Sequence, residues 1–317
     1  MSLTNGFQRP NLVTLITPLR FIKRTSVALA KSLALLWCAK RSDYEFKFVD
    51  IYLYFLELNQ KVPSIRRIRR MSDGGLLEIA INQTKIYWPE GISEQDLPWL
   101  YHEIFTPFKK NPSSYNHPEM RIEEKDWIID AGSAEGFFAL FCTERAKVSA
   151  KILVLEPLLV MQDSLRTTFK EYLASRVKLM RVAIGANDGF VRFEADSNHL
   201  CDSKISEHIV GGHDLVASPA FEEVQIKKID TICAEEELSG QGLIKMDIEG
   251  FEMKALEGAR EILNKYKPAL AIAVYHDYDN ANKCAEIIIS ANSDYRIEFR
   301  GCYGYFSPPR PYILFAY

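Results

Sequence analysis

Along the last two-thirds of the chain, short apolar runs alternate with segments whose apolar residues recur every three or four positions. The runs are typical of buried strands and the segments of amphipathic helices. The expected strands are residues 127–129, 152–155, 178–184, 243–246 and 269–274, and the expected helices are residues 137–146, 159–175, 251–266 and 280–291. This alternation predicts an α/β fold with a mostly parallel sheet covered on both faces. Two final runs, residues 295–299 and 312–317, predict an antiparallel hairpin at the sheet edge.

The first third of the chain has a different pattern. Apolar residues between positions 13 and 58 follow helical spacing, and residues 76–88 contain two strand-like runs around a polar turn, which predicts a hairpin. A short helix is expected over residues 91–105, and the polar run 109–118 is interpreted as a linker. We therefore predict a mainly helical N-terminal region with a small hairpin, residues 1–118, and a catalytic domain, residues 119–317.

Composition and charge argue against a nucleic-acid-binding protein and against a membrane-spanning one. The formal net charge is only −3 and both signs are mixed along the chain, so no nucleic-acid partner is expected. One basic cluster, residues 66–70, is interpreted as a solvated helix or loop face, with contact to phosphates or an anionic membrane as the alternative. The apolar stretch 27–38 is shorter than the roughly 20 residues of a membrane span. Scattered cysteines and the lack of an export signal predict a cytoplasmic location.

The residues that follow the strands are the candidates for chemistry, because ligand sites of such sheets form at the carboxyl ends of strands. The first strand leads into the turn Asp130-Ala131-Gly132-Ser133-Ala134-Glu135-Gly136. Gly132 allows a tight turn and the close approach of a ligand, and Gly136 lets the next helix pack against the strand. The carboxylates of Asp130 and Glu135 would repel the pyrophosphate of a dinucleotide, which argues against a dehydrogenase. S-adenosylmethionine (AdoMet) carries a sulfonium and an ammonium but no phosphate, so acidic residues suit it.

Two further strand ends are acidic. The second strand ends at Glu156-Pro157, where a carboxylate can accept both hydrogen bonds of a ribose diol. The fourth strand ends at Asp247, followed by Glu249 and Glu252 at the start of a helix. Glu252 has an alternative role there, because acids stabilise the helix dipole.

These motifs, taken together, resemble the FkbM family of AdoMet-dependent methyltransferases. The resemblance rests on K-M-D-I-E-G-F-E at 245–252, L-E-G-A at 256–259, D-A-G-S-A-E-G at 130–136 and E-P at 156–157, with the elements at 226–232 and 268–276. It covers about residues 126–317. The resemblance implies a class I methyltransferase (Rossmann-like) sheet, AdoMet as methyl donor, and commonly a hydroxyl acceptor on a sugar or natural product.

The resemblance also implies roles for individual residues. Asp130, Gly132, Ser133 and Glu135, with Gly136 closing the turn, form the methionine side of the AdoMet site, and Glu156 holds the ribose. Asp247 closes the pocket, Ile184 packs near the adenine, and Asp202 and Ser203 match a polar pocket element.

Methyl transfer requires alignment of donor and acceptor and removal of the acceptor's proton. His276, directly after the fifth strand, is a candidate general base that Asp277 could orient, and Asp247 and Glu249 are the other candidates. A divalent cation such as Mg²⁺, held by Asp247, Glu249 and His276 or Asp277, is an alternative means of activating the hydroxyl.

Other partners and functions are compatible with this pattern. The acceptor is expected to be a small molecule or a glycan. The N-terminal region is expected to form a lid or a contact in a homo-oligomer, with Trp88, Trp99, Tyr101 and Phe105 available to line an acceptor pocket. The alternative to catalysis is an AdoMet-binding or interaction protein that has kept the fold without turnover.

Overall fold

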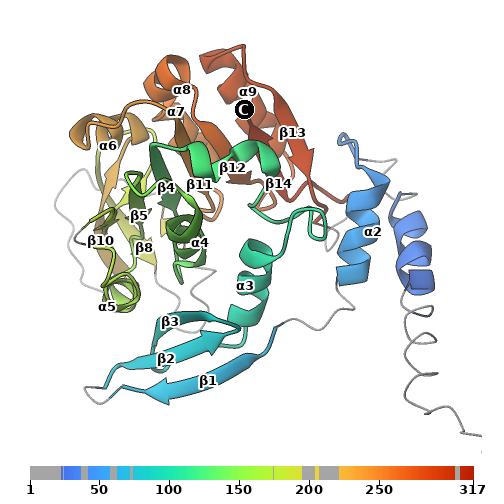
Figure 1. Cartoon of the computed structure of the whole chain (residues 1–317). Coiled ribbons are helices and arrows are strands. Elements are labelled where there is room, and N and C mark those ends of the chain that lie inside the picture. The colour runs from blue at the N-terminus through green and yellow to red at the C-terminus, as the bar shows by residue number, and fades with distance from the viewer. Residues whose placement is uncertain are drawn as a thin grey trace, which may run out of the picture.

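The computed structural model describes residues 23, 25–36, 42–57, 63–71, 74–173, 175–194, 204–206, 221–303 and 308–317. Its central feature is a seven-stranded sheet with helices on both faces (Figure 1). In spatial order the strands are β6 (Val177–Met180), β5 (Lys151–Leu155), β4 (Trp127–Ala131), β11 (Gly242–Met246), β12 (Ala269–Ala273), β14 (Ile313–Ala316) and β13 (Ile297–Arg300). Neighbours from β6 to β12 are parallel, whereas β14 is antiparallel to β12 and β13. This is the predicted class I methyltransferase fold, including its antiparallel C-terminal edge hairpin.

The inner strands are apolar because both faces of the sheet are covered. All residues of β4, β11 and β12 are buried. On one face, α4 (Phe137–Arg145) and α5 (Leu159–Thr168) pack with the N-terminal region into one hydrophobic cluster. On the other face, a second cluster includes α6 (Ile229–Glu235), α7 (Glu252–Glu257), α8 (Arg260–Tyr266) and α9 (Asn280–Ala291). The single helix predicted over 251–266 is therefore two helices.

A second, four-stranded sheet was not predicted. Its order is β7 (Ala183–Ile184), β10 (Phe221–Lys227), β8 (Gly189–Glu194) and β9 (Lys204–Ser206). The strand expected over residues 178–184 is divided between the two sheets, because the chain leaves the central sheet after β6 and pairs β7 with β10. Periodicity alone does not reveal such a change of partner.

The N-terminal region contains helices and a three-stranded sheet. Residues 25–36 and α2 (Phe48–Glu57) are helical, and β2 (Leu76–Ile81) and β3 (Thr84–Pro89) form the predicted hairpin. The basic cluster was interpreted as a helix or loop face, which is wrong, since residues 65–70 form strand β1 (Ile65–Arg70) at the edge of this sheet. No helix among the residues described is long and apolar enough to cross a membrane.

The polar run 109–118 is not an exposed linker. After α3 (Leu97–Phe105), residues 111–115 are all buried, and the short 3-10 helices η1 (Pro118–Met120) and η2 (Ile122–Glu124) lead into β4. One hydrophobic cluster continues from β2, β3 and α3 into the central sheet. The core is thus shared by the two predicted regions, and the domain boundary at residue 118 stays a prediction.

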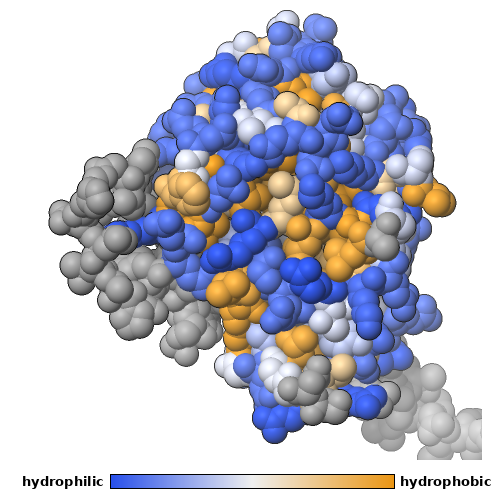
Figure 2. Space-filling view, turned by 90° about the vertical axis from the view of Figure 1, so that its left-hand side faces the viewer, coloured by the Kyte–Doolittle hydropathy of each residue, from blue (hydrophilic) through white to orange (hydrophobic). Residues whose placement is uncertain are grey.

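Figure 2 shows the side of the molecule that lies at the left in Figure 1. Hydrophilic residues cover most of this face, and apolar residues gather in a band across its middle. Large apolar side chains are exposed on α5 and β8, namely Leu159, Val160 and Phe190. Such a band on a hydrophilic surface is typical of a contact surface for a ligand or another protein.

An ion pair joins the N-terminal region to the C-terminal hairpin. Its removal tests how much this contact contributes to the stability of the protein. Both carboxylate oxygens of buried Asp50 on α2 contact the Arg300 guanidinium of β13, at 2.8 and 2.9 Å. We expect Asp50→Ala to lower the free energy of unfolding by about 3–5 kcal/mol, because it leaves a largely buried charge without this partner. Urea unfolding followed by circular dichroism measures this loss.

The control for Asp50→Ala is a pair at the surface. Glu144 and Arg145 lie 3.3 Å apart with both side chains about half exposed. Glu144→Ala should change the unfolding free energy by less than about 1 kcal/mol. Equal losses in the two variants would mean that the Asp50 pair does not anchor α2.

Candidate active site

A cavity of about 380 Å³ lies at the carboxyl ends of the parallel strands. The structure brings most of the predicted site residues to it. Those that line it are Gly132, Ser133, Glu135, Glu156, Ile184, Asp247 and Glu249. His276 contacts the last two, while Asp130 and Gly136 are not among the lining residues. Asp202 and Ser203 lie outside the described residues.

The turn after β4 brings backbone to the cavity. The amides of Gly132 and Ser133 donate to the Leu155 carbonyl oxygen at 3.1 and 3.2 Å. Gly132 has a φ of +70°, and a Cβ at this residue would lie only 1.8 Å from the Asp247 carbonyl oxygen. The close approach of the two loops therefore requires glycine at residue 132.

Asp130 supports this turn from beneath the cavity. It is fully buried, and its Oδ2 accepts hydrogen bonds from the Ser133 hydroxyl at 2.9 Å and the Ala139 amide at 3.2 Å. Its Oδ1 lies 3.2 Å from the Lys245 ammonium. Gly136 also acts through packing, because a Cβ there would come within 2.9 Å of the Phe169 ring. Both residues shape the site rather than line it.

Glu156 and Glu135 are buried carboxylates at the wall of the cavity. The oxygens of Glu156 accept hydrogen bonds from the amides of Ala134 at 2.9 Å and Leu158 at 3.0 Å. Burial raises the pKa of Glu156 to about 7, and it also raises the pKa of Glu135 to about 7. These carboxyls thus change charge near neutral pH.

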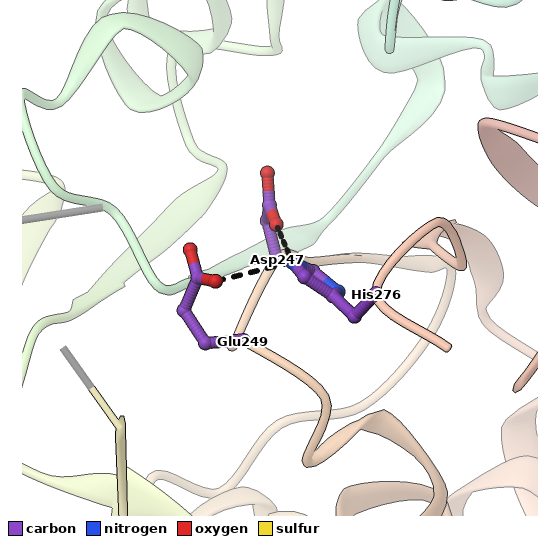
Figure 3. Close-up of side chains that lie close together, drawn as sticks. All are labelled: Asp247, Glu249 and His276. Carbon is purple, nitrogen blue, oxygen red and sulfur yellow. Dashed lines mark ion pairs between the residues drawn. The ribbon is translucent and has the colours of Figure 1, made fainter. Parts of the chain in front are cut away.

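Asp247, Glu249 and His276 meet where the loops after β11 and β12 approach each other. His276 Nε2 lies 3.5 Å from Asp247 Oδ1 and 3.3 Å from Glu249 Oε2, and the three side chains converge in Figure 3. The three potential ligand atoms lie within 4.8 Å of one another, a spacing that can hold a metal ion. Glu249 has a φ of +56°, so its backbone is strained at this position.

Glu252 fixes the same loop through hydrogen bonds to its backbone. It is fully buried, and its Oε1 accepts hydrogen bonds from the amides of Ile248 at 3.1 Å and Gly250 at 3.3 Å. Asn280 donates to its other oxygen at 3.0 Å, and His276 Nδ1 lies 3.3 Å from Oε1. Glu252 therefore positions the loop and the imidazole, in addition to its place in the first turn of α7.

The carboxylates around His276 decide its charge. Burial alone would lower its pKa, but Glu249, Glu252 and Asp247 raise the pKa of His276 to about 10. The imidazole therefore carries a proton at neutral pH. A protonated imidazole has no lone pair with which to accept a proton, which leaves the neighbouring carboxylate oxygens of Asp247 and Glu249 as the candidate acceptors in this cluster.

The opposite wall of the cavity is aromatic and was largely missed from the sequence. The Tyr115 hydroxyl donates to Asp247 Oδ2 at 2.9 Å, and the Tyr312 hydroxyl donates to Glu103. Trp99 also donates to Glu103, at 3.1 Å. Other lining residues to which no role was assigned from the sequence are Lys245, Tyr275 and Tyr303.

The four aromatic residues proposed for the acceptor pocket have different positions. Trp99 lines the cavity, as expected. Trp88 and Tyr101 belong to the hydrophobic core, and Phe105 packs against it. The interpretation is wrong for these three, because an aromatic residue type does not by itself distinguish a cavity wall from a core face.

Comparisons with known proteins define the class and then the family. The model of the methyltransferase FkbM domain matches residues 130–297, more than half of the chain. The protein belongs to the FkbM methyltransferase family, within the class of AdoMet-dependent methyltransferases. No curated protein matches the sequence.

Several solved structures resemble this chain at low sequence identity. An FkbM methyltransferase from Methylobacillus flagellatus KT is 18% identical with a TM-score of 0.48, over 92% of this chain and 60% of that chain. A precorrin-6y C5,15-methyltransferase from Geobacter metallireducens GS-15 is 12% identical with a TM-score of 0.36, over 63% and 84%. An rRNA methylase from Streptococcus thermophilus is 11% identical with a TM-score of 0.36, over 65% and 96%. The present chain thus spans about three-fifths of the FkbM structure's length.

Proposed function

We propose that this protein is an AdoMet-dependent O-methyltransferase that acts on a hydroxyl group of a sugar or natural-product acceptor. One observation carries the proposal. A single cavity joins the glycine turn and Glu156, which suit the donor, to the Asp247 and Glu249 carboxylates, which suit the activation of an acceptor.

The residues at the donor end fit AdoMet. The Gly132 turn brings backbone to the cavity, and Ile184 of β7 lines it. Glu156 keeps lone pairs that can accept hydrogen bonds from a ribose diol in addition to its two amide contacts. Glu135 adds negative charge, which favours a cofactor with a sulfonium and an ammonium. When bound, AdoMet supplies an electrophilic methyl group.

At the acceptor end, the chain's own residues position the nucleophile and remove its proton. Asp247 is fixed by the Tyr115 hydroxyl at 2.9 Å, and Glu249 is fixed by His276 at 3.3 Å. An alcohol oriented between these carboxylates can transfer its proton to one of them as its oxygen approaches the methyl group. Protonated His276 then holds the carboxylates in place and balances their charge.

A divalent cation is the second candidate means of activation. Asp247, Glu249 and His276 would hold it, and Glu252 would orient the imidazole through Nδ1. Oxygen and imidazole donors suit Mg²⁺ or a first-row metal, and such a cation would lower the pKa of a bound hydroxyl.

The N-terminal region is proposed to contribute to acceptor binding. Trp99, Glu103 and Tyr115 come from it, and they share the cavity with Tyr275 and Tyr312 of the catalytic domain. The aromatic rings can pack on a sugar ring, and the neighbouring carboxylates can accept hydrogen bonds from its hydroxyl groups. A small-molecule or glycan acceptor, a cytoplasmic location and assembly as a homo-oligomer remain predictions.

Binding of S-adenosylhomocysteine at several pH values tests the donor site. A ribose diol donates its hydrogen bonds to ionised Glu156, whose pKa is raised by burial to about 7. The affinity should therefore rise with pH and level off above pH 7, with a loss of up to about tenfold for each unit below it. Glu156→Gln should weaken binding at least tenfold at pH 8, about 1.4 kcal/mol. Calorimetric titration measures both effects.

The unliganded protein should show the opposite trend in stability. Glu156 and Glu135 bind their protons more tightly in the folded state, so their contribution to stability decreases as the pH rises from about 4.5 to about 7. A wild-type protein that is folded but binds neither AdoMet nor S-adenosylhomocysteine would contradict the proposed function. Cofactor binding without turnover on any hydroxylated acceptor would instead indicate a binding protein that has kept the fold.

A further inference from the structure

The methionine end of the proposed donor site requires a positive charge. The amino-acid part of AdoMet carries a carboxylate as well as an ammonium, whereas Glu135 and Asp130 at this end are acidic. A carboxylate next to two others is repelled unless a cation lies between them. No cation was assigned to this end of the site from the sequence.

Lys245 supplies such a cation. It lies on β11 directly beside Asp130 of β4, and its ammonium is almost entirely buried while still lining the cavity. Among the described residues that line the cavity, it is the only lysine or arginine. Burial lowers its pKa, but Asp130, Asp247 and Glu135 more than offset this effect and keep the pKa of Lys245 raised. The side chain is therefore charged at neutral pH.

The contacts of Lys245 fix its ammonium next to the glycine turn. Nζ donates to the Gly132 carbonyl oxygen at 2.7 Å and lies 3.2 Å from Asp130 Oδ1. It also lies 5.6 Å from the centre of the Tyr115 ring. An ammonium has three N–H donors, and these two oxygens are its partners in the part of the chain that the structure describes. The third donor can serve a ligand in the cavity.

We propose that Lys245 binds the α-carboxylate of AdoMet and thereby selects donors with an intact methionine moiety. This inference rests on the proposed function. In this arrangement Asp130 and Gly132 hold the ammonium in place, and the cofactor carboxylate completes its set of acceptors. Removal of the charge should weaken only ligands that have the carboxylate.

The test compares AdoMet with decarboxylated AdoMet, which keeps the sulfonium and the amine but lacks the carboxylate. The full-length wild type should bind AdoMet at least tenfold more tightly in calorimetric titrations. Lys245→Met should reduce this preference to less than about twofold, mainly by weakening AdoMet. Lys245→Arg, which keeps the charge, should retain part of the preference. Lys178→Met, an exposed lysine on β6 paired with Glu236, is the control and should leave the preference unchanged.

Lys245→Met alone leaves Asp130 buried without its cation, so a second variant guards against misfolding. Lys245→Met combined with Asp130→Asn removes both charges and should show the same lost preference in a protein with wild-type circular dichroism. The proposal is overturned if folded lysine variants keep the tenfold preference, or if they lose affinity equally for both ligands. A wild type that binds both ligands equally overturns it as well, whereas a wild type that binds neither contradicts the proposed function itself.

Discussion

Exchange of Glu249 for glutamine is expected to slow methyl transfer by about 10²–10⁴-fold, the range typical of the loss of a general base. Glutamine keeps the size of the side chain but cannot accept the proton of the acceptor hydroxyl or bind a cation as strongly. Affinity for S-adenosylhomocysteine should stay within about twofold, because the donor contacts lie at the Glu156 end of the cavity. The rate is measured as release of S-adenosylhomocysteine under single-turnover conditions, with an acceptor found by screening hydroxylated compounds.

The matched control is Glu257→Gln, an exposed carboxylate on α7 that does not line the cavity. It should leave the rate unchanged. Chelation separates the two means of activation. Loss of wild-type activity in EDTA and its recovery with Mg²⁺ or Mn²⁺ would establish the cation, whereas an unaffected rate would leave the carboxylates as bases. A Glu249→Gln rate within threefold of wild type would exclude both roles for this residue.

The second large effect is expected for Gly132→Ala. The alanine Cβ would lie 1.8 Å from the Asp247 carbonyl oxygen, so the loops after β4 and β11 must separate. The left-handed backbone alone costs about 1–2 kcal/mol, and overpacking adds roughly 1–3 kcal/mol. Because both loops line the cavity proposed to bind the cofactor, affinity for S-adenosylhomocysteine should fall at least a hundredfold, about 2.8 kcal/mol. Urea unfolding and calorimetric titration measure the two losses.

Gly91→Ala separates the two causes. Gly91 also has a left-handed backbone, with a φ of +93°, but a Cβ there would meet nothing within 4 Å. This variant should lose only the conformational part of the stability and bind S-adenosylhomocysteine normally. If both variants lose the same stability and both keep full affinity, the contact between the two loops does not control the cofactor site.

The part of the site at the strand ends could be predicted because its residues follow the strands of a parallel sheet. Glu156, Asp247 and His276 each lie at or just after the carboxyl end of a buried apolar strand, and such ends meet at one edge. Local sequence patterns were therefore enough to predict that these residues lie close to Glu249. The same rule could not separate residues that line the cavity from those beneath it. Asp130 and Gly132 are two positions apart, yet only Gly132 lines the cavity.

The aromatic wall of the cavity could not be predicted, because its residues meet only through long-range packing. Tyr115 is 132 positions from Asp247, to which it donates a hydrogen bond, and it lies in a polar run that suggested a linker. The contact between Tyr312 and Glu103 likewise joins distant parts of the chain. No periodic pattern marks such pairs. Lys245 belongs to one of the sequence motifs. Its position beside Asp130, however, depends on the register of β11 with β4, which the motif does not give.

Strand β1 has a consequence for how copies of this protein behave in concentrated solution. In the part of the chain described, β1 pairs on one side only, with β2, and its other side is an open sheet edge. An open edge can recruit a strand from another molecule and start aggregation. Arg66 and Arg69 are exposed along this strand, whereas the charge of exposed Arg70 is paired with Glu90. A second copy approaching edge to edge would bring the Arg66 and Arg69 charges of the two molecules together, and we expect this repulsion to oppose aggregation through β1.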